Sequence, residues 1–177
     1  EKGYEKANLR SICKRANVTT GAFYFSFESK EALLDFILAP LVKVYEDMIS
    51  TLREVQAAHP EQGADNDRKI MGFLMEHKRE SLIILEKCQG SKYEGYRQNV
   101  QDMMLESFNL YFSRFLKSLP DQHLMHILVS ERLQGCIDII KGDYDMDYSM
   151  YLVEKTGIFA NGGTAALIND LQKEEHH

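Results

Sequence analysis

Residues 8–27, NLRSICKRANVTTGAFYFSF, carry the most informative pattern in the sequence. The stretch opens with Asn8, and asparagine is one of the residue types that cap helix N-termini. The residues that follow at the spacing of one helix face are apolar or small, namely Leu9, Ile12, Cys13 and Ala16. This pattern predicts a short helix that ends near Ala16.

The second half of the stretch predicts a turn and another short helix. Asn17 and Val18 interrupt the helical pattern. Thr19 or Thr20 can then cap a helix that continues to about Phe25, since a hydroxyl accepts a hydrogen bond from the unpaired amides of a first helical turn. Two short helices joined by a tight turn form a helix-turn-helix, whose second helix can enter the major groove of DNA.

The contact between these two predicted helices should be apolar. We expect the small Ala16 to let the helices cross closely and Cys13 to act as a small buried hydrophobe. The residues expected to fix the crossing angle are Ile12, Val18, Phe23 and Phe27.

The rest of the chain is also predicted to be helical. Only three prolines and 11 glycines punctuate it, and apolar residues recur at helical spacing without sustained alternation. Ser29 should cap a long helix that runs to about Val55 and bends near Leu38 to Pro40, because proline removes a backbone donor. After a loop over 59–64, further helices are predicted over 67–87, 92–119, 121–141 and 147–173.

The predicted fold class is therefore all-α with two parts. Residues 1–38 form a helix-turn-helix DNA-binding domain, and residues 39–177 form a larger helical bundle.

Composition narrows the class of protein further. The 177 residues are 44% hydrophobic and 27% charged, which is ordinary globular usage. No apolar run approaches the roughly 20 residues that span a bilayer, so we expect no membrane partner. Three cysteines without a CxxC pair predict neither a disulfide framework nor a zinc site. We therefore expect a protein of the reducing cytoplasm with no cofactor.

The formal net charge of −6 argues at first against DNA binding. The charge is unevenly distributed, however. Residues 1–27 contain five basic and two acidic residues, so this segment carries +3 and the remainder carries −9. The acidity therefore lies outside the predicted helix-turn-helix and does not oppose phosphate binding there.

The residues in and around the opening stretch stand in one order with fixed gaps, namely Gly3-Tyr4, Ile12, residues 16–19, Gly21, Tyr24, Phe27, Lys30-Glu31 and Leu33. This pattern resembles the DNA-binding domain of the TetR family of transcriptional regulators over residues 3–34, about a fifth of the chain. Asn17 stands where the family usually has glycine, and Cys13 where it usually has alanine. The family also has a helix before the Gly-Tyr turn, so we expect the domain in this sequence to be incomplete at its N-terminus.

The resemblance implies a set of base-reading residues on the exposed face of the second helix, namely Thr20, Gly21, Ala22 and Phe25. Glycine lets the backbone approach DNA, and the alanine methyl suits contact with thymine. The positions that contact phosphates in the family are occupied here by Asn8, Thr19, Tyr24, Ser26 and Lys30. Ser26 replaces a usual histidine or tyrosine, which leaves a shorter hydrogen-bonding arm. Alternatively, Tyr24 is a core tyrosine and Lys30 a solvated lysine.

The larger part carries an apolar and aromatic stripe over 100–115 that is expected to face residues 70–82. The stripe is either packed core or, in part, the wall of a ligand pocket, because methionines and aromatics make adaptable apolar walls. The candidate pocket residues are Phe73, Leu74, Met103, Met104, Phe108, Tyr111 and Phe112.

The last two predicted helices are rich in apolar and small residues. The resemblance implies that they pair with their counterparts in a homodimer, which would match a palindromic operator. The alternative is burial within one monomer.

Two patterns in the sequence partly match metal sites. Asp143, Asp145, Asp147 and Glu154 follow the spacing of a calcium loop, but Tyr148 stands where that loop needs glycine. His123 and His126 share a helix face without a third ligand, and the terminal His176 and His177 can be a tag remnant. We expect no metal site.

The sequence thus predicts a dimeric transcriptional regulator rather than an enzyme, with the repressor as the first hypothesis. It would bind a palindromic operator and be released by a small-molecule effector. The alternative is a helical small-molecule-binding protein or an enzyme that does not bind DNA. Cys88 with His77 or His59 could serve as nucleophile and base, yet no nucleophile motif or orienting group accompanies them.

Overall fold

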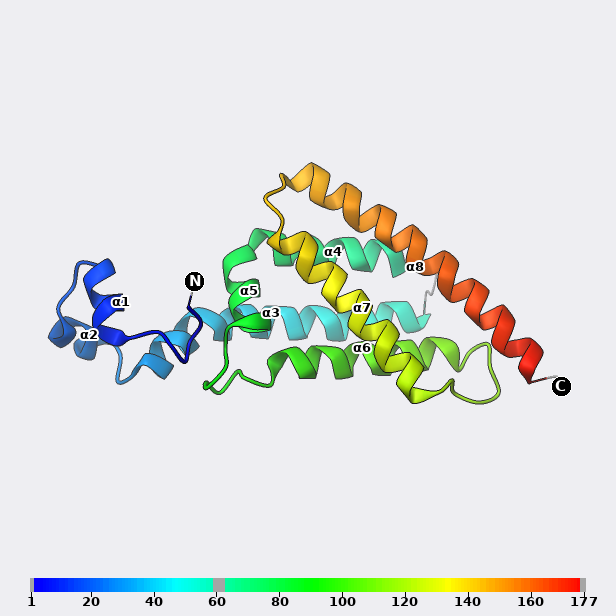
Figure 1. The fold of residues 1–177 in the computed structure, drawn as a ribbon, viewed down its shortest axis with the longest axis horizontal. Coiled ribbons are helices and arrows are strands. Elements are labelled where there is room, and N and C mark those ends of the chain that lie inside the picture. The colour runs from blue at the N-terminus through cyan, green and yellow to red at the C-terminus, as the bar shows by residue number, and fades with distance from the viewer. Residues whose placement is uncertain (1, 59–62, 176–177) are drawn as a thin grey trace.

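The computed structural model describes residues 2–58 and 63–175. Within these ranges the regular secondary structure consists of α-helices, and there is no β-strand (Figure 1). The helices are α1 (Leu9–Arg15), α2 (Thr20–Ser26), α3 (Lys30–Ala58), α4 (Gly63–Glu76), α5 (Lys78–Glu86), α6 (Tyr96–Phe112), α7 (Gln122–Lys141) and α8 (Met146–Glu174). The predicted all-α fold is confirmed.

The molecule is elongated, with α1 and α2 at one end and the bundle of α4 to α8 at the other (Figure 1). Helix α3 starts beside α1 and α2 and runs along the bundle, so the domain boundary predicted at residue 38 falls inside a continuous helix. Pro40 lies within α3 without ending it, and the predicted bend there stays a prediction.

The larger of two hydrophobic clusters holds α3, α4, α5, α6, α7 and the first half of α8 together. Leu38, Ile137 and Ile140 are fully buried in it. A second, smaller cluster around Phe112 and Met125 joins the end of α6 to α7 and α8. Because α8 contributes to both clusters, it ties the far end of the bundle to its middle.

The prediction of one continuous helix over 67–87 is wrong. The backbone breaks at His77 (φ −107°, ψ 38°), so that α4 ends at Glu76 and α5 begins at Lys78. The buried hydroxyl of Ser81 donates to the carbonyl of Leu74 across the break (3.1 Å), which satisfies a polar group that the interrupted helix would otherwise leave unpaired. The predicted loop over 59–64 is also partly wrong: residues 63 and 64 belong to α4, and 59–62 lie outside the described residues.

The helix predicted over 92–119 is too long at both ends. Helix α6 begins at Tyr96 and ends at Phe112, so Phe115 lies beyond the stripe assigned to it. The segment before α6 turns at Gly90, which has φ +78°, a conformation that glycine adopts without a steric cost. The helices predicted over 121–141 and 147–173 are confirmed, and their caps are Asp121 and Asp145.

No helix in the described ranges combines the length and the apolar composition needed to cross a membrane.

The turn between α1 and α2 depends on Asn17. This residue has φ +54°, and the amide of Val18 donates to the carbonyl of Cys13 (3.0 Å) while the amide of Asn17 donates to that of Lys14 (3.2 Å). These are the two hydrogen bonds of a Schellman C-cap, in which the left-handed residue is usually glycine. The prediction that asparagine preserves the turn is confirmed.

Replacing Asn17 tests this constraint. We expect Asn17→Ala to lower the free energy of unfolding by about 1 kcal/mol, because Cβ is strained in the left-handed region. Asn17→Gly should leave it within about 0.5 kcal/mol of the wild type, because glycine accepts this conformation. Urea unfolding of the three proteins measures both values. Equal stability of the alanine and glycine variants would contradict the role of the left-handed turn.

Candidate nucleic-acid interface

The two short helices are held by local caps that their sequences supply. The side chain of Asn8 accepts from the amide of Arg10 (2.8 Å) at the start of α1. The hydroxyl of Thr19 accepts from the amide of Ala22 (3.0 Å) at the start of α2. Both predicted caps are therefore confirmed. Each side chain is exposed, so both helix N-termini face solvent.

The orientation of α2 is fixed by the burial of one aromatic residue. Phe23 is buried and its ring contacts that of Phe27 (centroids 5.6 Å apart), which in turn contacts Phe36 on α3 (5.5 Å). With Phe23 inward, the opposite face of α2 must point to solvent. Cys13 on α1 is buried as predicted.

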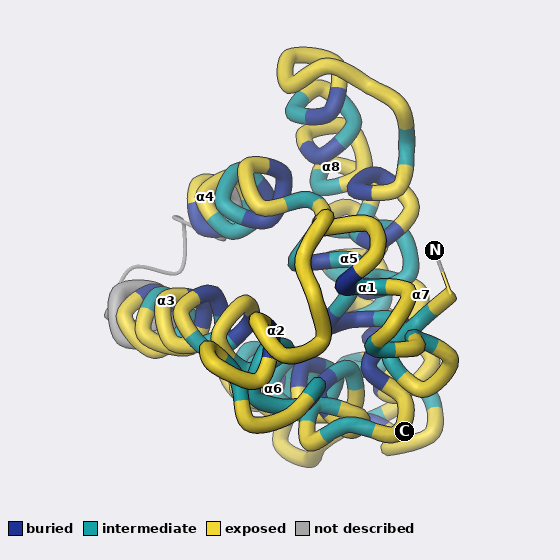
Figure 2. The backbone as a smooth tube through the Cα atoms, turned by 90° about the vertical axis from the view of Figure 1, so that its left-hand side faces the viewer, coloured by how far each residue is buried: buried dark blue, intermediate teal, exposed yellow. Residues whose placement is uncertain are grey.

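The outward face of α2 holds the residues predicted to read bases. Thr20, Gly21, Ala22 and Phe25 are all exposed, and Phe25 is 94% exposed. Figure 2 shows α2 as a largely exposed helix. An exposed aromatic side chain leaves apolar surface in water, and a partner that covers it gains the free energy of removing that surface from water. The structure therefore brings the predicted base-reading set together on one accessible surface.

Among the predicted phosphate contacts, Tyr24 and Ser26 are exposed beside this face. The ring of Tyr24 meets that of Phe23 edge to face, with centroids 5.4 Å apart, so its apolar part is anchored while its side chain remains 56% exposed. This position suits a hydroxyl that reaches toward a phosphate.

Lys30 has partners that the sequence did not reveal. Its ammonium donates to the carbonyls of Tyr4 (2.7 Å) and Ala7 (3.1 Å) and lies 3.9 Å from the centroid of the Tyr4 ring. It is therefore not the freely solvated lysine of the alternative interpretation. In this structure Lys30 fastens the segment before α1 to the start of α3, and its phosphate contact stays a prediction.

Two residues predicted to lie in the contact between α1 and α2 do not. Val18 is 46% exposed and Ala16 is exposed, because the described chain places no element over them. Ile12 and Phe27 are half-buried. The contact instead rests on Cys13 and Phe23, the two buried residues of these helices.

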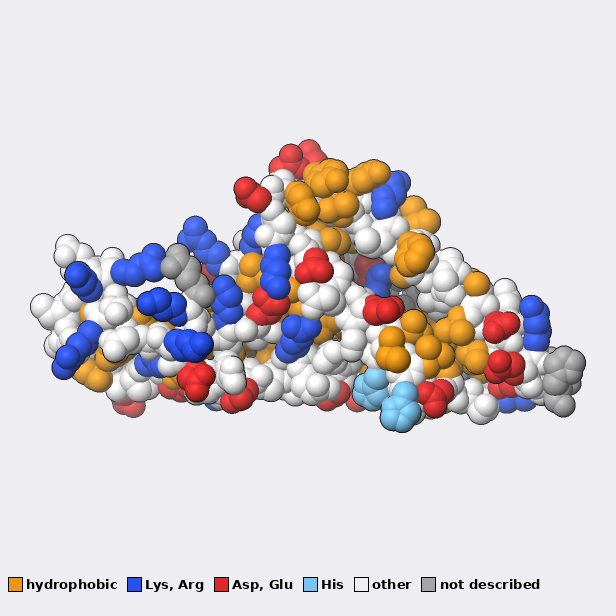
Figure 3. Space-filling view, in the orientation of Figure 1, with side chains coloured by type: hydrophobic (Ala, Val, Ile, Leu, Met, Phe, Trp, Pro, Cys, Tyr) orange, Lys and Arg blue, Asp and Glu red, His pale blue; other side chains and the backbone are white. Residues whose placement is uncertain are grey.

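The charge of this end of the molecule favours an anionic partner. Lysine and arginine side chains gather over the end that carries α1 and α2, as Figure 3 shows. They belong to the segment whose formal charge is +3, whereas the rest of the chain is acidic. A basic end next to an exposed recognition surface is what binding to the DNA backbone requires.

Two residues of the calcium-like pattern, Asp145 and Glu154, have other partners. The carboxylate of Asp145 accepts from the amide of Tyr148 (2.8 Å), and Glu154 pairs with Lys155 (2.6 Å) and Arg68 (3.4 Å). Within the described residues, no three side chains of His, Cys, Asp or Glu are grouped so that they could hold a metal ion.

The predicted pocket residues divide between the two hydrophobic clusters. Phe73, Leu74, Met103 and Met104 belong to the larger cluster, and Phe108, Tyr111 and Phe112 to the smaller one. A ligand site among them stays a prediction.

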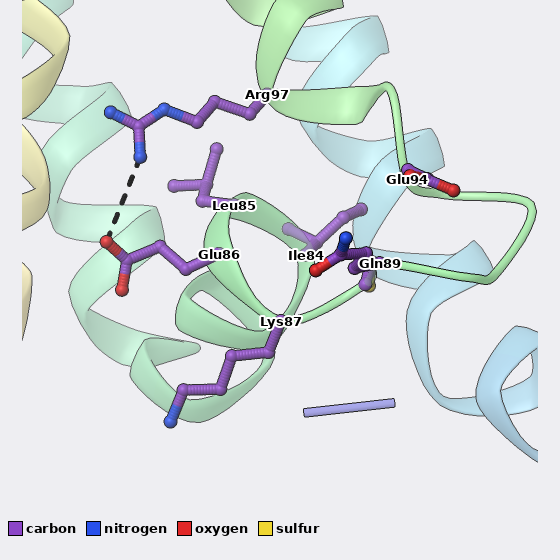
Figure 4. Close-up of a pocket in the computed structure, with 8 residues that line it drawn as sticks. Ile84, Leu85, Glu86, Lys87, Gln89, Glu94 and Arg97 are labelled. Carbon is purple, nitrogen blue, oxygen red and sulfur yellow. Dashed lines mark ion pairs between the residues drawn. The ribbon is translucent and has the colours of Figure 1, made fainter. Parts of the chain in front are cut away.

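A hollow of about 480 Å³ lies elsewhere, where α5 ends and α6 begins (Figure 4). Its charged lining includes Glu86, which pairs with Lys141 (2.6 Å) and lies 3.9 Å from Arg97. Cys88 also lines it, and burial raises the pKa of this thiol, which disfavours the thiolate that a nucleophile needs. No periodic pattern in the sequence predicts this hollow, because its walls come from two helices and the turn between them.

Helix α1, the left-handed turn at Asn17 and α2 form a helix-turn-helix whose second helix has an exposed outer face. Residues 1–37 match the sequence model of a family described as bacterial regulatory proteins, tetR family. The A-factor receptor protein of Streptomyces griseus is 35% identical over 75 residues, which covers 42% of this chain and 25% of that protein. Residues 1–37 are therefore similar to the DNA-binding domain of TetR-family regulators, and the part of the chain that matches the A-factor receptor protein spans about a quarter of that protein's length.

Gly21 allows stability and recognition to be separated. A methyl group at Gly21 would meet only the hydroxyl of Thr19, at 3.8 Å, so the fold has room for it. We expect Gly21→Ala to raise the free energy of unfolding by up to about 1 kcal/mol, since alanine favours helix over glycine. The same variant should bind DNA more weakly, because the methyl group blocks close approach of the backbone.

Gly72→Ala on α4 is the matched control, since a methyl group there meets nothing within 4 Å. It should stabilise the protein similarly and leave DNA affinity unchanged. Thermal unfolding and fluorescence anisotropy with labelled DNA measure the two properties. Unchanged DNA affinity in Gly21→Ala would rule out backbone approach at this position.

Proposed function

We propose that the protein is a transcriptional repressor that binds a palindromic operator as a homodimer and is released from it by a small-molecule effector. The observation that carries the proposal is the outward face of α2, where Phe25 and its neighbours are exposed although Phe23 anchors the helix from behind. A rigid short helix with an accessible face can lie in the major groove, and apolar side chains such as Phe25 contact thymine methyl groups there.

Electrostatics support DNA over an acidic or neutral partner. The basic segment over 1–27 coincides with the end that presents α2, and the −9 of the remaining chain lies mostly on the bundle, away from that end. Phosphate contacts supply affinity and register, whereas base contacts supply sequence preference. The two predicted sets of residues follow this division.

A homodimer through α7 and α8 is supported by exposed apolar side chains. Ile158 and Phe159 on α8 are 60% and 84% exposed, and Ile127 on the neighbouring α7 is also exposed. Apolar side chains gather over α8 and the adjoining part of α7 in Figure 3. A two-fold axis through this surface would place two copies of α2 on one DNA duplex, as a palindromic operator requires.

Control by a ligand is supported by the relative's name and by α3. The A-factor receptor protein is named as a receptor, and its similarity to this chain includes a quarter of its own length. Helix α3 joins the DNA-binding end to the bundle, so a ligand that favours one tilt of α3 would change the placement of α2.

Substitutions in the proposed interface should separate affinity from sequence preference. We expect Tyr24→Phe and Lys30→Ala to weaken binding to all DNA sequences alike, and Lys30→Ala to lower the slope of log K against log salt by about 1. Thr20→Ala should change the preferred base at one position of each half-site, with a discrimination of about 1 kcal/mol or more.

Gel shifts on the protein's own upstream DNA, with scrambled DNA for comparison, measure these effects. Lys173→Ala on α8 is the control for loss of one positive charge far from α2. Operator affinity that is unchanged in all three interface variants would refute the site. No sequence-specific shift with the wild-type protein would favour the alternative, a helical small-molecule-binding protein or an enzyme.

A negative charge introduced at Phe159 tests the proposed dimer surface. We expect Phe159→Asp to raise the dimer dissociation constant at least about 30-fold, because an exposed aromatic residue at an interface centre contributes about 2 kcal/mol or more. Leu110→Asp is the control, since Leu110 is 52% exposed but lies on α6. Sedimentation velocity measures both. A Phe159→Asp protein that dimerises like the wild type would exclude this surface.

A further inference from the structure

The segment between α5 and α6, residues 87–95, contacts the DNA-binding end of the molecule through three hydrogen bonds. The amide of Tyr4 donates to the carbonyl of Lys87 (2.8 Å). The amide of Lys92 donates to Glu31 Oε1 (2.8 Å), and the hydroxyl of Tyr93 donates to Asp35 Oδ1 (2.5 Å). Both acceptor carboxylates lie on the first two turns of α3, one turn apart.

Glu31 bridges the two parts of the molecule with one carboxylate. Its Oε2 accepts from the hydroxyl of Tyr4, in the segment before α1, while its Oε1 accepts from the amide of Lys92. These two hydrogen bonds lower the pKa of Glu31, and burial together with Glu31 raises the pKa of Tyr4 to about 12. At neutral pH the carboxylate is therefore ionised and the phenol protonated, which are the states that this bridge needs.

Asp35 makes a second connection to the same segment. It accepts from the hydroxyl of Tyr93 and pairs with the ammonium of Lys92. The hydrogen bonds from Lys92 and Tyr93 lower the pKa of Asp35. Lys92 thus engages both carboxylates, Glu31 through its amide and Asp35 through its side chain.

The other contacts across this junction are few. Among the described helices, α1 and α2 pack on each other, and no helix of the bundle packs extensively against either of them. The placement of α2 relative to the bundle therefore depends on α3 and on the contacts of residues 87–95. The same segment forms part of the wall of the hollow in Figure 4, where Lys87, Gln89 and Glu94 line it.

The two carboxylates are unfavourable for DNA binding by charge alone. A negative side chain near the recognition surface repels phosphates. They accept hydrogen bonds from Tyr4, Lys92 and Tyr93, however, and these bonds connect the start of α3 to the segment before α1 and to residues 87–95.

We propose that Glu31 and Asp35 are positioning residues that, through Lys92 and Tyr93, hold the DNA-binding domain on the bundle in the orientation that binds the operator. This inference rests on the proposed function and adds its regulation: a change in residues 87–95 alters operator affinity without any contact to DNA. Helix α3 supplies the stiff connection, and the two carboxylates set where its first turns lie.

The sign of the effect separates this proposal from simple electrostatics. Neutralising an acidic residue near DNA strengthens binding if the residue only repels phosphates. Loss of a positioning contact weakens it. We expect Glu31→Gln to lower operator affinity about tenfold, in the range of couplings between sites. The exposed Glu28, three residues earlier, is the control, and Glu28→Gln should bind as well as the wild type or slightly better.

Tyr93→Phe tests the bundle side of the connection. It removes only a hydroxyl, in a segment that is 58 residues away in sequence from Asp35. We expect it to lower operator affinity several-fold with little change in melting temperature, and the double variant Asp35→Asn/Tyr93→Phe to be no weaker than Asp35→Asn alone. A purely local role of Asp35 in stabilising α3 would leave the Tyr93→Phe protein unaffected.

A measurement without DNA keeps this proposal separate from the proposed function. In the full-length Glu31→Gln protein, hydrogen exchange at the amides of Tyr4 and Lys92 should become faster than in the wild type, with amides of α7 unchanged. If exchange is unchanged at both amides, the connection is refuted even when the wild-type protein binds its operator. If exchange changes but the wild-type protein binds no specific DNA, the proposed function fails and the connection between the two parts stands.

Discussion

One continuous helix, α3, belongs to both parts of the molecule and therefore links the position of α1 and α2 to the packing of the bundle. Its first turn holds Lys30 and Glu31, which bind the segment before α1. Two turns further along, Leu38 is fully buried in the core of the bundle. Because α3 is continuous through both parts, its packing in the bundle constrains where its first turns and the segments bound to them lie.

The burial of Phe23 determines which face of α2 is exposed. Phe23 is buried against the ring of Phe27, which in turn contacts Phe36, and the period of the helix then leaves Thr20, Gly21 and Phe25 outward. The cost of exposing Phe25 is a hydrophobic one, which contact with DNA bases would offset. Affinity and sequence preference would thus come from opposite properties, the basic charge of residues 1–27 and the apolar and backbone surface of α2.

Acidic residues have two distinct roles in this molecule. Most of them give the bundle its negative charge, which would disfavour DNA there and favour it at the basic end of the proposed interface. Glu31 and Asp35 lie at that DNA-binding end, and there each one is matched by donors from residues 4, 92 and 93. A carboxylate beside a surface that binds phosphates would lower DNA affinity by repulsion. The hydrogen bonds that Glu31 and Asp35 accept give a structural reason for carboxylates at these two positions. The junction between the two parts thus combines these polar contacts with the apolar packing of Leu34 and Leu38 in the larger cluster.

The sequence by itself determined the features that depend on residues close together along the chain. Asn8 and Thr19 cap their helices, Asn17 turns the chain in the left-handed conformation, and the caps of α7 and α8 follow the same local rules. Tertiary structure alone decided the break at His77, the start of α6 and the exposure of Val18, because no local residue type requires them. The partners of Lys30, Glu31 and Asp35 lie 26, 61 and 58 residues away, so only the packing of α3 against both parts brings them into contact.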